Sequence, residues 1–150
     1  MSLLVLDVSV AVKWVLPLTG EPLTAEALEL LDRFAKRKVD FLVPDLFWVE
    51  LGNVLWKAAR TGRCAPKDAE AALLALRSRN LPTISSDGLL EQALSIALTF
   101  DRTMYDSIYV ALAVQAHCDL ITADERLANA LAAHLPVKWL GSIEQSHIAR

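Results

Sequence analysis

The chain has 150 residues, of which 54% are hydrophobic, and its formal net charge is −3. This length predicts one domain over residues 1–150 with a core of its own, and the charge excludes attraction to nucleic acid through a general positive field, so any such binding needs a local basic patch. The hydrophobic share exceeds the roughly 45–50% of an average soluble domain, which indicates apolar surface that a partner covers.

Short apolar runs alternate with longer amphipathic stretches along the chain. The apolar runs, which we expect to be strands, are 3–6, 41–43, 81–84, 120–122 and 137–140. The stretches that predict helices lie near 24–37, 45–61, 66–78, 87–100, 104–117 and 124–134, with a further helix-like run at 9–15. This alternation favours an α/β fold in which helices flank a parallel β-sheet on both faces. In open sheets of this kind, ligands bind beyond the carboxyl ends of the strands.

The cysteines and the N-terminal segment bear on the cellular compartment. Cys64 and Cys118 lie far apart and lack metal-site spacing, so we expect reduced thiols in a cytoplasmic protein. Residues 1–18 are apolar, but they lack a basic start and are interrupted by Asp7 and Lys13. We therefore expect neither a signal peptide nor a membrane span there.

Four acidic residues carry the functional prediction. Asp7 ends the first apolar run, Asp124 follows the fourth, Asp106 lies at a helix start and Glu50 lies within a helix. If the fold brings them together, their combined charge of about −4 needs a divalent cation wherever they are partly buried. Hard cations prefer oxygen ligands, and a metal-bound water becomes hydroxide for attack on phosphorus. The pattern is typical of a metal-dependent phosphodiesterase.

Three of these acids also have a purely structural interpretation. Asp7 precedes a helix-like run and is as readily an N-cap as a ligand. The run Thr122-Ala123-Asp124-Glu125 has the form of a capping box with an additional acid in the first turn. The run Thr103-Met104-Tyr105-Asp106 resembles such a box with Asp in place of Glu. Spacing alone does not decide between the two interpretations.

Glu50 shares one stripe of its predicted helix with Asn53, Lys57 and Arg60. This stripe is either a solvated face of a mostly buried helix or one wall of a groove that meets a phosphate backbone. The cations that we expect to grip a substrate each lie within a few turns of an acid: Lys13, Lys57, Arg60, Arg102 and Arg126. For Arg102 or Arg126 taken singly, an ordinary surface charge or a helix ion pair is the alternative.

Four segments together resemble the PIN-domain nucleases and, within them, the VapC-like toxins of bacterial toxin–antitoxin pairs. They are LDVSVAVKW, ELGNVLWKAARTG, TMYDSIYVALA and LITADERLA, and they span nearly the whole chain in the order of that family. The resemblance implies a PIN-like three-layer α/β/α fold and an endoribonuclease that depends on Mg²⁺ or Mn²⁺. It implies that the catalytic and metal-binding residues are Asp7, Glu50, Asp106 and Asp124. It also matches Ser9 and Asn53 to the family's small hydroxyl and asparagine positions, where we expect contact with the substrate.

The resemblance further implies partners and roles. An RNA substrate, a homodimer or a higher assembly, and a cognate antitoxin laid across a hydrophobic groove are expected, with the groove within 24–60. We expect Asp7 and Asp106 to be the principal metal ligands, Asp124 to complete the site, and Glu50 to hold a second metal or orient the attacking water. The chain has four tryptophans: Trp14, Trp48, Trp56 and Trp139. By default, we expect most of them to be core residues.

Three rival interpretations apply to a set of acids in an α/β chain. A phosphoacceptor receiver domain expects adjacent acids after the first strand and an aspartate ending the third, but Asp7 stands alone and the third run ends in Ser85 and Ser86. A haloacid-dehalogenase-type phosphatase expects Asp-x-Asp, where this chain has Asp7-Val8-Ser9. A catalytically silent PIN-like scaffold that binds RNA or an antitoxin remains the alternative, although no acid of the set is missing.

Overall fold

In the part of the chain that the structure describes, five parallel strands form the sheet, in the order β3-β2-β1-β4-β5. The structure is a computed structural model, and it describes residues 1–16 and 20–143. The strands are β1 (Ser2–Leu6), β2 (Val39–Pro44), β3 (Thr83–Ile84), β4 (Asp119–Thr122) and β5 (Val137–Trp139). The helices are α1 (Val8–Val15), α2 (Thr24–Ala35), α3 (Leu46–Arg60), α4 (Pro66–Arg77), α5 (Leu90–Phe100), α6 (Met104–Gln115) and α7 (Glu125–Leu131), with the 3₁₀ turns η1 (Ser86–Leu89) and η2 (Leu140–Ser142).

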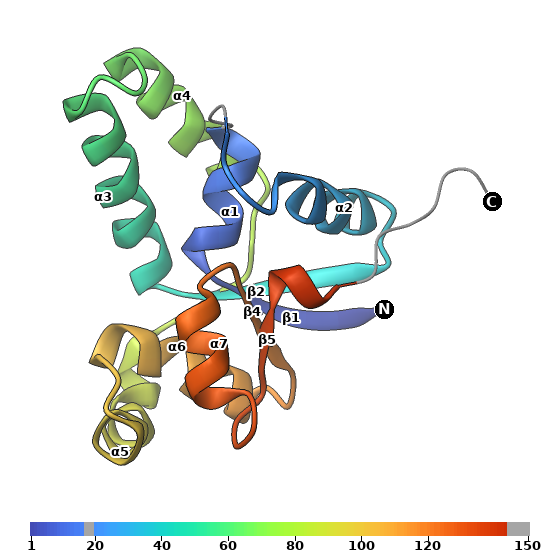
Figure 1. The fold of residues 1–150 in the computed structure, drawn as a ribbon, viewed down its shortest axis with the longest axis vertical. Coiled ribbons are helices and arrows are strands. Elements are labelled where there is room, and N and C mark those ends of the chain that lie inside the picture. The colour runs from blue at the N-terminus through green and yellow to red at the C-terminus, as the bar shows by residue number, and fades with distance from the viewer. Residues whose placement is uncertain (17–19, 144–150) are drawn as a thin grey trace.

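The helices cover both faces of the sheet. Helices α1 to α4 lie on one side and α5 to α7 on the other (Figure 1). Right-handed crossovers explain this division, because the chain first steps from β1 to β2 and β3, and then returns across the sheet to β4 and β5. Neighbouring strands β1 and β4 therefore begin connections that leave in opposite directions, and a crevice opens beyond their carboxyl ends. The predicted α/β class with two covered faces is confirmed.

The central strands are buried because helices cover them on both sides. Val5 and Leu6 of β1, like Leu120 and Ile121 of β4, have no exposed surface. Such continuous apolar runs are typical of parallel strands with two covered faces. On the α1–α4 side, Phe41 of β2 meets two aromatic rings, with centroid distances of 5.5 Å to Trp14 and 5.1 Å to Phe34. The carboxyl ends of β1 and β4 are thus anchored in a rigid core.

The third strand is shorter than predicted. Leu81 is buried in the core, and Pro82 contributes a carbonyl that accepts from Val43 N at 3.0 Å. Proline has no N–H to donate to a neighbouring strand. The regular pairing with β2 therefore begins only at Thr83, and β3 has two residues where the sequence predicted four.

Trp56 is the tryptophan that lies outside the core, which agrees with the prediction that most of the tryptophans belong to it. Its side chain on α3 is 56% exposed, and the Arg60 guanidinium lies 5.4 Å from the ring centroid. The other three tryptophans pack against the core as predicted: Trp14, Trp48 and Trp139. Both cysteines carry free thiols. Within the described residues, every helix is too short or too polar to cross a lipid bilayer.

Candidate functional site

Asp7 lies just beyond the carboxyl end of β1, at the crevice between β1 and β4. Its backbone N–H donates to Ile121 O at 3.2 Å, which ties this end of β1 to β4. Although Asp7 occupies the N-cap position of α1, its carboxylate makes no capping hydrogen bond. Its Oδ2 instead accepts from Ser9 Oγ at 2.6 Å and from Thr122 Oγ1 at 2.7 Å. The N-cap interpretation is therefore wrong for this side chain.

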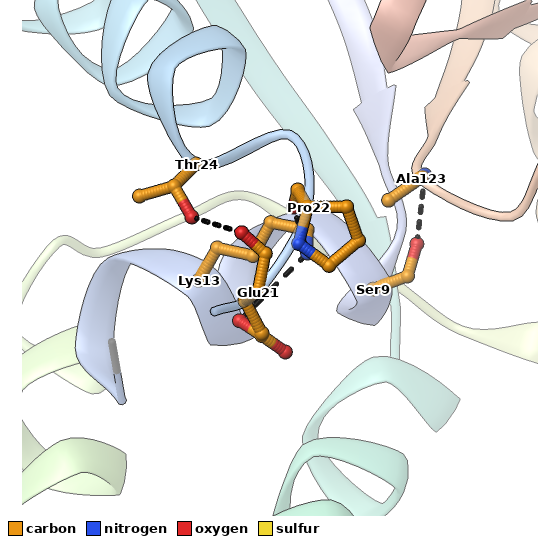
Figure 2. A network of polar contacts seen from close by, with 6 residues as sticks. All are labelled: Ser9, Lys13, Glu21, Pro22, Thr24 and Ala123. Carbon is orange, nitrogen blue, oxygen red and sulfur yellow. Dashed lines mark hydrogen bonds and ion pairs between the residues drawn. The ribbon is translucent and has the colours of Figure 1, made fainter. Parts of the chain in front are cut away.

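The two hydroxyls that bind Asp7 are themselves held by backbone N–H groups. Ser9 Oγ accepts from Ala123 N at 3.0 Å (Figure 2), and Thr122 Oγ1 accepts from Asp124 N at 3.0 Å. Each hydroxyl has one proton, and each gives it to Asp7, so none is left for the 3.3 Å contact between the two oxygens. The orientation of the Asp7 carboxylate is thus fixed by the loop that follows β4.

Two of the other acids lie at helix starts. Thr103 is the N-cap of α6, and its hydroxyl accepts from Asp106 N at 3.1 Å, as the predicted cap requires. At α7 the predicted capping box is shifted, because Asp124 is the N-cap and its Oδ1 accepts from Leu127 N at 3.2 Å. Thr122 still belongs to β4 and binds Asp7 instead. Asp124 therefore has a structural role in addition to any role as a ligand.

Four acids act on one another electrostatically. Burial raises the pKa of Asp7, and the Asp106 charge raises it further, while hydrogen bonds from two hydroxyls oppose the increase. Burial also raises the pKa of Glu50, with further increases from Asp7 and Asp106. For Asp106, burial and then the Asp124 charge raise the pKa, and the Arg102 charge lowers it. A cation among these carboxylates would lower the cost of burying their charges and would reduce the repulsion between them.

Three of the acids line a common cavity. It has a volume of about 750 Å³ and lies between α1, α3 and the turn after β4. Asp7, Glu50 and Asp124 line it, and Tyr105, the residue before Asp106, lines it as well. Valines and a leucine line the same cavity and form an apolar wall: Val8, Val12, Leu46, Val49 and Val54. The fold therefore gathers three predicted acids in one cavity, with Asp106 close enough to act on two of them.

The predicted substrate-binding residues separate into two groups. Ser9, Lys13 and Asn53 line the cavity. The remaining three do not line it in the described structure, and all three are exposed: Lys57, Arg60 and Arg126. In the stripe on α3, Glu50 and Asn53 thus line the cavity, whereas Lys57 and Arg60 do not. Contact of the exposed cations with a substrate stays a prediction.

Lys13 alone among the described lining residues is cationic, but its ammonium group is already engaged. Its side chain is 7% exposed, and Nζ donates to Pro22 O at 2.9 Å and lies 3.7 Å from Glu21 Oε2 (Figure 2). Thr24 Oγ1 adds a hydrogen bond to Glu21 O at 3.0 Å. Lys13 therefore holds the segment before α2 against the cavity, and its charge is partly offset by Glu21.

The donor set suits a hydrated divalent cation. Among the residues that the structure describes, no three carboxylate, histidine or cysteine side chains converge on one point as a closed metal cage would require. Mg²⁺ commonly keeps several waters and takes only one or two carboxylates from a protein. Carboxylates spread around an open cavity fit that mode of binding, and the fixed orientation of Asp7 suits a direct ligand.

Sequence reasoning missed three residues that bear on this site. Thr122 was considered only as a cap, whereas it donates to Asp7. Glu21 lines the cavity through its pairing with Lys13. Tyr109 lies one turn after Asp106 and interacts with the Glu50 carboxylate. The spacing of Asp106 and Tyr109 on one predicted helix face was the available signal for the last of these.

The sequence of the chain matches a known protein family and several of its relatives. A family model described as the PIN domain matches residues 4–131. Ribonuclease VapC3 of Pyrobaculum aerophilum is 33% identical over 110 residues, which are 72% of this chain and 84% of the relative. Exonuclease VapC9 of the same organism is 32% identical over 115 residues, or 73% and 80% of the two chains.

Solved structures share the fold at low sequence identity. A crystal structure from Pyrobaculum aerophilum has a TM-score of 0.69 and 21% identity, over 95% of this chain and 91% of that one. A toxin–antitoxin complex from Klebsiella pneumoniae contains a chain with a TM-score of 0.64 and 16% identity, over 93% and 99% of the two chains. At such identities the likeness shows a common fold.

Proposed function

The chain belongs to the PIN domain family, and from that premise we propose that it is a metal-dependent endoribonuclease that acts as the toxin of a toxin–antitoxin pair. The observation that carries the proposal is the set of mutually repelling acids at the carboxyl ends of β1 and β4. Relatives named as VapC ribonucleases support RNA as the substrate.

The proposed roles follow from how each acid is held. Asp7 is the principal ligand for Mg²⁺ or Mn²⁺, because two hydroxyls hold its Oδ2 in place. Asp106 and Asp124 are further ligands for the cation, supplied from the starts of α6 and α7. When bound, the cation would lower the pKa of water and offset charge on the scissile phosphate. Glu50, which lines the cavity together with Asp7, is placed to direct a carboxylate oxygen toward the cation.

An apolar wall beside the acids suits a single-stranded substrate. Tyr105 is 60% exposed and Val49 is 72% exposed, and both line the cavity with the acids. Unpaired bases stack on exposed aromatic rings, so a base next to the cleaved phosphate would cover this wall. The Asn53 amide, one turn after Glu50, supplies a polar contact for the sugar or phosphate.

An antitoxin is the proposed partner for the remaining apolar surface. Exposed apolar side chains are present in the predicted groove region, at Leu28, Val49, Val54 and Trp56. The toxin–antitoxin complex with the same fold supports such a partner. We also propose a homodimer, which light scattering of the purified chain would test.

The experiment that tests the activity is incubation of the purified chain with a mixed RNA pool in Mg²⁺, in Mn²⁺ and in EDTA. We expect cleavage with either metal and none in EDTA. Circular RNA, which has no ends, separates endonuclease from exonuclease action and is expected to be opened. Asp7→Asn is expected to abolish cleavage, because the amide keeps the side-chain shape but loses the negative charge.

The control for Asp7→Asn is its thermal melt, which we expect to match or exceed that of the natural protein. Cleavage that persists in this variant would contradict the assignment of Asp7. No cleavage by the natural protein, together with no Mn²⁺ binding, would favour the catalytically silent scaffold. Cleavage of linear but not circular RNA would show that the protein is an exonuclease and not an endonuclease.

A further inference from the structure

A tyrosine lies beneath the acids with no fully formed hydrogen bond. Tyr109 is on α6, one turn after Asp106, and it is 2% exposed. Its hydroxyl oxygen is buried and has no partner at hydrogen-bonding geometry among the described residues. Helix α6 packs on the central strands β1, β2 and β4, so this side chain belongs to the rigid floor of the site.

Three acids act electrostatically on the Tyr109 hydroxyl. Burial raises the pKa of Tyr109, and the charges of Asp7, Glu50 and Asp106 raise it further. A phenol ordinarily carries its proton at neutral pH, so the Tyr109 hydroxyl is available as a donor. A neutral hydroxyl among carboxylates can stabilise them only as a donor, because ionised carboxylates have no proton to give.

Glu50 is the acid that this donor meets. Contact with Tyr109 lowers the pKa of Glu50, against the increase that burial causes. The contact falls short of a complete hydrogen bond in the described structure. A buried donor that stays unsatisfied destabilises the fold, so a small movement of the Glu50 carboxylate that completes the bond is favourable.

We propose that Tyr109 is a positioning residue, which donates its hydroxyl proton to one oxygen of Glu50 and so directs the other oxygen into the cavity toward a bound cation. This inference rests on the proposed metal-dependent function. A carboxylate that is held at one oxygen by a donor presents its other oxygen in a fixed direction, and such orientation of a ligand strengthens metal binding.

A purely packing role for Tyr109 leads to a different expectation for metal affinity. Phenylalanine would fill the same space without leaving a buried hydroxyl unsatisfied. If only packing mattered, Tyr109→Phe would stabilise the fold and change nothing else. The two roles thus differ in their effect on metal affinity.

The test measures Mn²⁺ binding by isothermal titration calorimetry together with thermal melting of the metal-free protein. We expect Tyr109→Phe to melt at the same temperature as the natural protein or higher, and to bind Mn²⁺ about tenfold more weakly or worse, as is usual when a group that orients a metal ligand is removed. Ser107→Ala is the matched control, because Ser107 Oγ is also buried on α6 without a hydrogen-bond partner in the described residues. Its Mn²⁺ affinity is expected to stay unchanged.

A double-mutant cycle tests whether Tyr109 acts through Glu50. Glu50→Gln alone is expected to weaken Mn²⁺ binding, and adding Tyr109→Phe to it is expected to cause no further loss. Additive losses would overturn the proposed route through Glu50. Unchanged Mn²⁺ affinity in Tyr109→Phe, or an unfolded Tyr109→Phe protein, would overturn the inference while leaving the proposed function intact. A natural protein that binds no Mn²⁺ would instead overturn the proposed function and the inference with it.

Discussion

Thr122 Oγ1 donates its proton to Asp7 Oδ2 across 2.7 Å, although the two residues are 115 positions apart in the chain. The bond joins the ends of two neighbouring strands, β1 and β4, whose pairing places Leu6 opposite Ile121. Because Thr122 Oγ1 also accepts from Asp124 N, one hydroxyl links two of the acids. The shape of the site thus depends on the sheet register.

Removing the Thr122 hydroxyl is expected to weaken the site and the fold together. In Thr122→Val, the Asp124 N–H loses its acceptor and Asp7 loses a donor, which we expect to lower the free energy of unfolding by about 1–3 kcal/mol. Mn²⁺ affinity is expected to fall as well. Thr122→Ser keeps the hydroxyl and is the matched control for both measurements. Equal Mn²⁺ affinity in the Val and Ser variants would count against a role of this hydroxyl in holding Asp7.

The stability of the metal-free protein is expected to fall as the pH rises above the ordinary pKa values of the acids. Three acids have a pKa above their ordinary values, which are 3.8 for Asp7 and Asp106 and 4.5 for Glu50. Between the ordinary and the raised pKa, the folded state binds more protons than the unfolded state, so unfolding becomes easier as the pH rises. Thermal melts from pH 4.5 to 7.5 would show this as a decreasing melting temperature.

Two comparisons assign that pH dependence to the acids. Asp7→Asn is expected to flatten the profile, because it removes one of the three titrating groups. Saturating Mg²⁺ at pH 7 is expected to restore stability, by about 2.7 kcal/mol at a hundredfold excess over its dissociation constant. A melting temperature that rises steadily with pH in the metal-free protein would contradict the raised pKa values.

The Lys13–Glu21 pair is expected to matter for the position of the segment before α2. Lys13→Met removes the hydrogen bond to Pro22 O and leaves Glu21 without its cation, at an expected cost of about 1–3 kcal/mol. Glu21→Gln is expected to cost less, because the Pro22 bond remains. Urea unfolding of both single variants and of the double variant gives the coupling. If the double variant is no more stable than the sum of the two losses predicts, the pair contributes nothing.

The exposed cations of α3 are expected to act through charge alone. If Lys57 contacts the RNA backbone, Lys57→Ala weakens binding equally for all sequences, and the slope of log K against log salt becomes shallower by about 0.7, the value for one contact with a single strand. Binding is measured with Ca²⁺ in place of Mg²⁺ to suppress cleavage. Lys67→Ala on α4, another exposed lysine that does not line the described cavity, is the matched control. Equal salt slopes for the two variants would exclude a specific contact at Lys57.

Much of the fold could be predicted because each strand is a short apolar run that ends at a polar or turn residue. Strand β1 was predicted at 3–6 and lies at Ser2–Leu6, and α4 was predicted at 66–78 and lies at Pro66–Arg77. The error at β3 has a local cause, since Pro82 interrupts the ladder of hydrogen bonds. The sequence did not show which tryptophan would be the exposed one, because hydrophobicity alone does not show which side of a helix the core leaves uncovered.

The candidate site could be predicted as a set of acids but not as a set of contacts. Asp7, Glu50 and Asp124 were expected at one edge of the sheet, and all three line the same cavity. Their partners could not be predicted, because the bond from Thr122 to Asp7 depends on which strands become neighbours. Lys13 shows the same limit, since its engagement by Glu21 and Pro22 depends on how the segment before α2 folds back.

The strand order also has a consequence for synthesis of the protein. Strands β1, β2 and β3 emerge from the ribosome first, yet the neighbour that completes the acidic crevice is β4, which begins at Asp119. Until Thr122 has been translated, Asp7 lacks one of its two hydroxyl donors. A growing chain therefore has no assembled acidic crevice while β1, β2 and β3 are being made on the ribosome.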